Sequence, residues 1–174
     1  MTSIRVVASI GVLLSLSAFA GVSGAAGVDW SKAKPIPDEG LQWGIIPLDG
    51  GKVEAFFGRP ESDYVVVRMS CPAARSIAFS YIDSTMAPNA KYRVHMRTGK
   101  HEFLLPGSTK DRWEMDDLVD LQFGPTADRL LYDDLKAGAE LRVVIEAVSG
   151  KWTTGVAMPG DSKALAPFFA ACGA

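Results

Sequence analysis

Residues 64–71, Tyr-Val-Val-Val-Arg-Met-Ser-Cys, decide the fold class of this chain. Alternate residues of an extended segment point to opposite faces. One face would carry Val65, Val67, Met69 and Cys71, and the other would carry Tyr64, Val66, Arg68 and Ser70. This two-residue period predicts a β-strand with one face in the core.

The same period recurs along the chain. It is found in residues 77–81, 92–96, 141–147 and 152–158. Residues 42–47 and 52–57 flank Leu-Asp-Gly-Gly at 48–51, whose residues accept positive φ, and this arrangement predicts a hairpin. Short strands at this spacing predict a mainly β protein, an antiparallel sandwich or barrel of roughly seven to ten strands.

Two segments break the alternation and predict short helices. In residues 126–137, Thr126 can cap a helix that Gly138 stops, with leucines on one side. In residues 162–172 the apolar side chains recur at helical spacing, at Leu165, Phe168, Phe169 and Cys172. Pro167 removes one backbone hydrogen bond from this second helix, which therefore kinks or begins there.

The first 25 residues have the features of a secretory signal peptide. Arg5 precedes an uncharged apolar run over residues 6–20, and small residues allow cleavage after Ala20 or Ala25. The run is too short to span a bilayer comfortably, and no second long apolar stretch follows, so a membrane-spanning protein is not expected. We expect a signal peptide over 1–25, an extended lead-in over 26–40 and a single β-sandwich domain over 41–174.

The charge balance argues against nucleic acid as a partner. The chain has 18 Lys and Arg against 20 Asp and Glu, a formal net charge of −2, which becomes −3 when Arg5 is cleaved off. A surface that binds nucleic acid generally needs a basic excess.

Export determines how the two cysteines are interpreted. Oxidising compartments favour disulfides, so we expect Cys71 and Cys172 to pair and to tie the C-terminal segment to the middle of the sheet. Two free buried thiols or two metal ligands are the alternatives. A bridge across 101 positions would stabilise the fold by roughly 4 to 5 kcal/mol through the unfolded chain.

The most unusual local feature is a strand with a basic face. Alternation over residues 91–97 places four polar side chains on one side: Lys91, Arg93, His95 and Arg97. Clustered charge steers association, so this face could dock an acidic protein, an anionic glycan or a lipid head group. The alternative is a solvated face that makes weak cross-strand ion pairs with the acidic segment at 113–146.

Motifs for catalysis or for holding a cofactor are missing. His95 and His101 are the two histidines, and with Glu102 and Asp111 they match no metal-ligand spacing. The chain has no Gly-x-Ser-x-Gly and no glycine-rich phosphate loop. We therefore predict no catalytic residue, no metal and no cofactor.

The four tryptophans divide into two pairs. Trp43 and Trp152 fit strand interiors and are expected in the core. Trp30 and Trp113 lie in less regular stretches, and we expect them to be surface anchors.

The C-terminal third resembles a known family. A strand over 141–148, a Ser-Gly turn, a strand over 152–159, Gly-Asp-Ser-Lys-Ala-Leu at 160–165 and a final Cys172 follow in order. This order resembles the invasion-associated locus B family of small exported alphaproteobacterial proteins, although Asp161 and Pro167 depart from its pattern. The resemblance implies an Ig-like β-sandwich in the periplasm and brings no catalytic residues.

Together these features predict an exported, non-enzymatic binding or accessory protein of the bacterial envelope, either periplasmic or secreted. Its partner is expected to be a protein or an anionic envelope component, bound through the basic strand. Two alternatives stay open. One is a small envelope hydrolase that uses His95 or His101 as its base, and the other is a lysozyme inhibitor that inserts the loop at 149–151.

Overall fold

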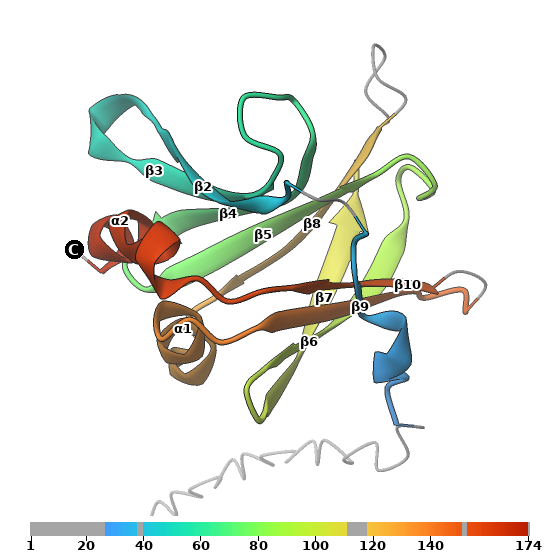
Figure 1. Ribbon diagram of the computed structural model, residues 1–174. Helices are drawn as coiled ribbons and strands as arrows, with labels where there is room; N and C mark the ends of the chain where they lie inside the picture. The colour runs from blue at the N-terminus through green and yellow to red at the C-terminus, as the bar shows by residue number, and fades with distance from the viewer. Residues whose placement is uncertain (1–26, 38–39, 111–117, 151–152, 174) are drawn as a thin grey trace, which may run out of the picture.

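Alternate side chains of the predicted strands at 77–81 and 92–96 are buried in the computed structural model, which describes residues 27–37, 40–110, 118–150 and 153–173. Within these residues, ten strands form one sheet in the order β1-β10-β9-β6-β7-β8-β5-β4-β3-β2 (Figure 1). Their bounds are β1 Lys34–Pro35, β2 Gln42–Pro47, β3 Val53–Gly58, β4 Val65–Ala73, β5 Ser76–Asp83, β6 Lys91–Thr98, β7 His101–Thr109, β8 Val119–Thr126, β9 Leu141–Ala147 and β10 Thr153–Met158.

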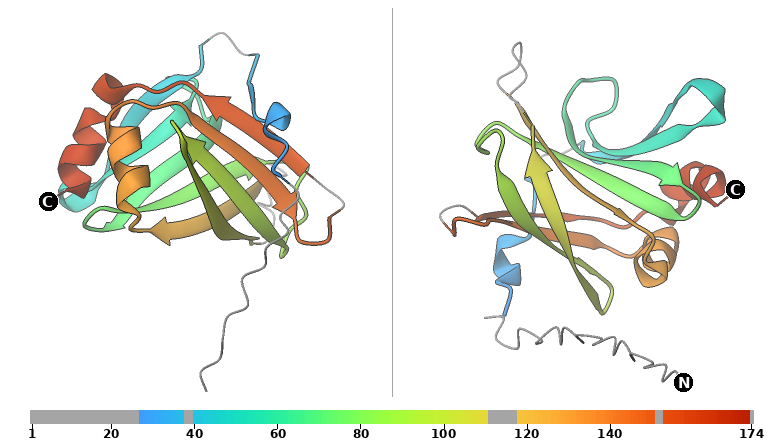
Figure 2. Two further views of the ribbon diagram at one scale, coloured as in Figure 1. Left: turned by 90° about the horizontal axis from the view of Figure 1, so that it is seen from below. Right: turned by 180° about the vertical axis from the view of Figure 1, so that it is seen from behind.

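The sheet curls so that its two halves face each other. Strands β2, β3, β4, β5 and β8 form one half, and β7, β6, β9 and β10 form the other (Figures 1 and 2). The halves join where β7 pairs with β8 over three residues, from Gly107 to Thr109. Side chains from both halves meet in one core that includes Met69, Phe79 and Ile145.

The predicted fold class is confirmed. The structure is mainly β and antiparallel, with two short helices, one of them C-terminal. The two layers are halves of one continuous hydrogen-bonded sheet and not two separate sheets. Among the described strands, β1 and β10 make the one parallel pair.

The hairpin predicted before β4 is confirmed by β2 and β3. Trp43 pairs with Phe57 in the register, and the amide of Leu48 donates to the carbonyl of Lys52 at 2.8 Å. A short 3-10 turn, η2 at Asp49–Gly51, makes the reversal, and Gly50 has φ of 72° there. A side chain would strain this conformation, which explains the pair of glycines.

Helix α1, Arg129–Lys136, is capped by Asp128 rather than by Thr126. The Asp128 carboxylate accepts from the amides of Leu130 and Leu131 at 2.8 and 3.3 Å. The predicted cap was wrong because Thr126 ends β8, where its hydroxyl oxygen accepts from the Asp128 amide at 3.3 Å. The cap must directly precede the first helical residue to reach these free amides.

Helix α2, Ser162–Cys172, begins after an Asp161 cap and continues through Pro167. The predicted apolar spacing is confirmed by its buried residues, which are Leu165, Phe168, Phe169 and Cys172. This face packs against β2, β3 and α1 (Figure 1). Cys172 forms a disulfide with Cys71 on β4, with the two Cα atoms 5.5 Å apart. The expected pairing of the two cysteines is confirmed.

The lead-in is more structured than the sequence predicts. Within it, the 3-10 turn η1 at Trp30–Lys32 precedes β1, which extends the sheet beside β10. Ala33 is buried, and a Cβ on Gly155 of β10 would lie 2.9 Å from the Ala33 amide nitrogen. The glycine on β10 therefore lets the lead-in lie directly on the sheet. The predicted signal peptide at 1–25 lies outside the described residues.

Candidate binding face

Strand β6 presents the four predicted basic-face residues on the outer side of the sheet. Its alternate residues Tyr92, Val94, Met96 and Thr98 are buried in the core. Lys91 and Arg93 are exposed, whereas His95 and Arg97 are partly buried. The two-residue period therefore brings the four side chains together, as expected.

At the His95–Arg97 end of this face, both side chains lie near carboxylates of neighbouring strands. His95 Nε2 lies 3.5 Å from a Glu146 carboxylate oxygen on β9, and Arg97 Nε lies 3.7 Å from Glu102 on β7. The Arg97 guanidinium also lies over the Trp30 ring, 5.5 Å from its centroid. The contact between His95 and Glu146 is the cross-strand pairing that the sequence predicts with the acidic segment at 113–146. Each of these contacts is worth at most about 1 kcal/mol, but together they reduce the outward positive potential at this end.

Trp30 is a partly buried anchor for the lead-in. The sequence predicts it on the surface, and the structure places it against Arg97 from a segment 67 positions earlier. Trp43 is in the core, as predicted, and its indole donates to the Pro159 carbonyl at 2.7 Å. Trp113 and Trp152 lie outside the described residues.

Lys91 and Arg93 lie at the other end of β6. Neither has an ion-pair partner within 4.0 Å anywhere in the part of the chain that the structure describes. In the register Arg93 lies opposite Pro106 on β7 and Glu146 on β9, and one oxygen of Glu146 lies 3.5 Å from His95 Nε2. The positive potential of the face is therefore concentrated at Lys91 and Arg93.

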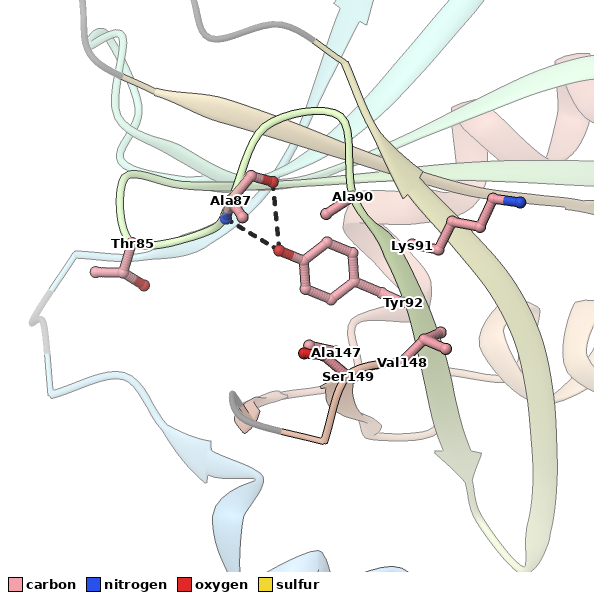
Figure 3. A pocket seen from close by; sticks show the side chains of 8 residues that line it. All are labelled: Thr85, Ala87, Ala90, Lys91, Tyr92, Ala147, Val148 and Ser149. Atoms are coloured by element: carbon pink, nitrogen blue, oxygen red, sulfur yellow. Dashed lines mark hydrogen bonds between the residues drawn. The ribbon is translucent and has the colours of Figure 1, made fainter.

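An apolar hollow of about 380 Å³ adjoins Lys91 (Figure 3). Its lining comes from the β5–β6 connection, the start of β6 and the end of β9, and comprises Thr85, Ala87, Ala90, Lys91, Tyr92, Ala147, Val148 and Ser149. Val148 is 56% exposed beside it. Tyr92 shapes the wall, since its hydroxyl accepts from the Ala87 amide at 3.0 Å and donates to the Ala87 carbonyl at 3.4 Å. The hollow offers an apolar contact beside the start of β6, and the Lys91 side chain points away from it toward the outer face (Figure 3).

The two histidines lie on opposite faces of the sheet. His95 faces outward, while His101 pairs with the buried Thr98 and so shares the inward face. His101 Nδ1 lies 2.7 Å from an Asp134 carboxylate oxygen on α1, and the Thr98 hydroxyl donates to the same oxygen at 2.9 Å. No single pocket can therefore use both imidazoles.

The Asp134 carboxylate ties α1 to the β6–β7 hairpin. Burial raises its pKa, but hydrogen bonds from His101 and Thr98, helped by the charges of His101 and Lys100, outweigh burial and hold the pKa below the usual value. A carboxylate that accepts such bonds is stabilised in its charged form. The geometry is thus that of a structural link between helix and hairpin.

Metal coordination finds no support in the described part of the chain. No three His, Cys, Asp or Glu side chains come together there in an arrangement that could hold a metal ion. The sequence left open that the two cysteines are metal ligands, but they are joined to each other in a disulfide.

A polar hollow on the opposite half of the sheet was missed in the sequence. It gathers residues from four strands, β3, β4, β5 and β8. Part of this hollow could have been found from the sequence, because the polar residues Arg68 and Ser70 occupy the outward positions of β4. Their neighbours on the other strands could not be known before the strand order was known.

Comparison with known proteins adds no assignment: no family model, curated protein or solved structure matches the chain. None of the described helices combines the length and the apolar character needed to cross a bilayer. The class that the fold and site define is an antiparallel β domain with one disulfide and a partly neutralised basic face.

Proposed function

We propose that this chain is an exported, non-enzymatic binding or accessory protein of the bacterial envelope that docks an anionic partner at Lys91 and Arg93. The observation that carries the proposal is the division of the basic face. His95 and Arg97 are engaged with Glu146, Glu102 and Trp30, while Lys91 and Arg93 have no ion-pair partner among the described residues.

The neighbouring hollow supports a partner with a mixed chemistry. Lys91 lines the hollow, and most of the surface around it comes from alanine, valine and tyrosine. A carboxylate or phosphate on Lys91 or Arg93 could place an adjoining apolar group against Val148. Charge then steers the encounter, and the apolar contact adds affinity that salt does not screen.

Export is the second part of the proposal. It rests on the predicted signal peptide, and the disulfide is compatible with an oxidising compartment. The resemblance to the invasion-associated locus B family points the same way, to a periplasmic location. Intact-mass measurement of native protein should show a chain that begins after Ala20 or Ala25, and a full-length native chain with free thiols would contradict export.

The docking test reverses the two unpaired charges. Lys91→Glu combined with Arg93→Glu should abolish low-salt binding to vesicles that contain phosphatidylglycerol and to polygalacturonate, two anionic probes. It should also remove the main components that the unaltered protein captures from native envelope extract. Binding by the unaltered protein should fall as salt rises to about 0.5 M, because the interaction is between exposed charges.

The matched control is Lys52→Glu combined with Lys163→Glu, which changes the net charge equally at exposed sites away from β6. It should leave binding of both probes unchanged. Equal binding by the two double variants would remove the Lys91–Arg93 end from consideration.

A further inference from the structure

The second hollow, of about 330 Å³, lies on the outer surface of the other half of the sheet. It is independent of the proposed docking face, which lies on β6. Its lining spans β3, β4, β5 and β8 and comprises Glu54, Arg68, Ser70, Ala78, Phe79, Ser80, Asp120, Gln122, Phe123, Gly124 and Pro125. Six of these side chains are polar, and they stand on neighbouring strands.

Small residues create the floor of this hollow. Ser70 on β4 lies opposite Ala78 on β5 in the register, and Gly124 follows on β8. Gly124 has φ of 85°, and a Cβ there would lie 3.1 Å from the Ile77 carbonyl, so a larger residue is disfavoured. A row of small side chains between larger ones leaves a depression in an otherwise covered face.

The larger polar side chains stand along the next row. Arg68 on β4 pairs with Ser80 on β5, which pairs with Gln122 on β8. Residues that are directly opposite each other on adjacent strands share a face, so these three side chains form one polar line. The line borders the floor along its whole width.

Arg68 contributes a donor that the protein does not use. Its Nε is fully buried and makes no hydrogen bond to any described residue. A buried donor without an acceptor costs free energy, so this group needs an acceptor, a water or a ligand, from outside the described residues. Glu54, half-buried on the neighbouring strand, lines the same hollow and makes no ion pair with Arg68 within 4.0 Å.

Asp120 is held in place as an acceptor. The Ser80 hydroxyl donates to one carboxylate oxygen, and the Gln122 amide donates to the other at 3.2 Å. Each carboxylate oxygen has a further lone pair, so Asp120 can still accept from a ligand. The hollow therefore presents fixed acceptors beside the partly buried Arg68 side chain, which makes no hydrogen bond or ion pair with any described residue.

From this arrangement we infer that the hollow is a binding site for a neutral saccharide unit. A hydroxyl group donates one hydrogen bond and accepts two, so a polyhydroxylated ring can accept from Arg68 while it donates to Asp120 and Glu54. A shallow hollow across four strands also fits a ring better than a compact ion does.

The charges select against an ionic ligand. Arg68, Glu54 and Asp120 together carry a formal charge of −1, so an anion that approaches Arg68 meets two carboxylates. A cation that approaches the carboxylates meets Arg68. A neutral ligand that both donates and accepts avoids either repulsion and satisfies both signs.

The test is an NMR titration of the purified protein with three neutral oligosaccharides: maltotriose, cellotriose and chitotriose. At least one should shift the Arg68 Nε–H and Gln122 side-chain amide signals, together with backbone amides of β4, β5 and β8. Arg68→Gln should weaken that binding by about tenfold or more, because a hydrogen bond to a charged donor is lost. Arg129→Gln is the matched control, since Arg129 is exposed on α1 and paired with Asp133, and it should bind as the unaltered protein does.

A second variant separates binding from folding. Ala78→Leu fills the floor without removing a polar group, and it should abolish the titration while the rest of the spectrum stays folded. The inference is overturned if none of the three oligosaccharides shifts these signals, or if Ala78→Leu leaves the shifts intact. Shifts produced at this site by glycine or acetate, with none from the oligosaccharides, would also overturn it.

Discussion

Removal of the Cys71–Cys172 disulfide should cost the protein a large part of its stability. The bridge closes a loop of 101 positions. For a loop of that length the loss of chain entropy in the unfolded state corresponds to about 4 to 5 kcal/mol. The free energy of unfolding of a single domain is only about 5 to 15 kcal/mol, so loss of this one bond would remove a large part of it.

The assay is urea unfolding, followed by circular dichroism, of the oxidised protein, the reduced protein and a Cys71→Ala/Cys172→Ala variant. Both disrupted forms should lose about 4 to 5 kcal/mol of unfolding free energy. Their melting temperatures should fall by about 10 to 20 °C for a domain of this size. The native fold should persist, because Phe168 and Phe169 of α2 stay buried and the Tyr132 hydroxyl still donates to the Phe169 carbonyl at 3.0 Å.

Comparison of the oxidised with the reduced protein isolates the covalent bond, and comparison of the reduced protein with the alanine variant isolates the packing of the sulfur atoms. Cys172 is only 1% exposed, so replacing its sulfur by hydrogen also removes core contacts, whereas reduction keeps the sulfur atoms. The two forms should agree to within about 1 to 2 kcal/mol. A loss below about 1 kcal/mol on reduction would refute the entropic argument, and alkylation of both cysteines in native oxidised protein would refute the link itself.

Three further predictions test local contacts. Asp134→Asn should destabilise the fold by about 1 to 2 kcal/mol at neutral pH, because it weakens the tie to His101. Since the pKa of the Asp134 carboxyl is lowered by folding, this difference should be full above its ordinary value of 3.8 and should be lost as the pH falls from there through the lower pKa of the folded state, measured by unfolding from pH 7 to 2. Asp128→Ala should cost about 1 kcal/mol and Thr126→Ala clearly less; equal losses in thermal unfolding would contradict the assigned cap. Gly160→Ala should lower the melting temperature strongly, because its new carbon would overlap the backbone of the turn after α1; an unchanged melting temperature would contradict this close approach.

The local pattern accounts for most of the predicted elements. Alternation identified β4, β5, β6, β9 and β10, as in Val67 and Met69 of β4, because a side chain's face in a strand depends only on its own position. It did not identify β1, β7 or β8. The turn at 48–51 and the helical spacing of α2 were equally local. The helix cap was misplaced by two residues, because Thr126 and Asp128 are both good caps and the strand's end decided between them.

The candidate sites, too, were predicted from the sequence only in part. Membership of the basic face followed from the sequence, since Lys91 and Arg93 alternate with buried residues along one strand. Which of its charges stay unpaired did not, because Trp30 and Glu146 reach β6 from distant segments. The polar hollow depends wholly on strand order.

The sequence by itself determined strands β2 to β6, β9 and β10, the two helices and the two cysteines available to pair, whereas β1, β7 and β8 were not predicted. Only the tertiary structure decided that β5 lies beside β8 and β6 beside β9, and hence which charges meet and where hollows form. The physical reason is that hydrophobic burial requires only that apolar faces be covered, and it is non-directional. The particular partner of each strand emerges from the packing of the whole chain.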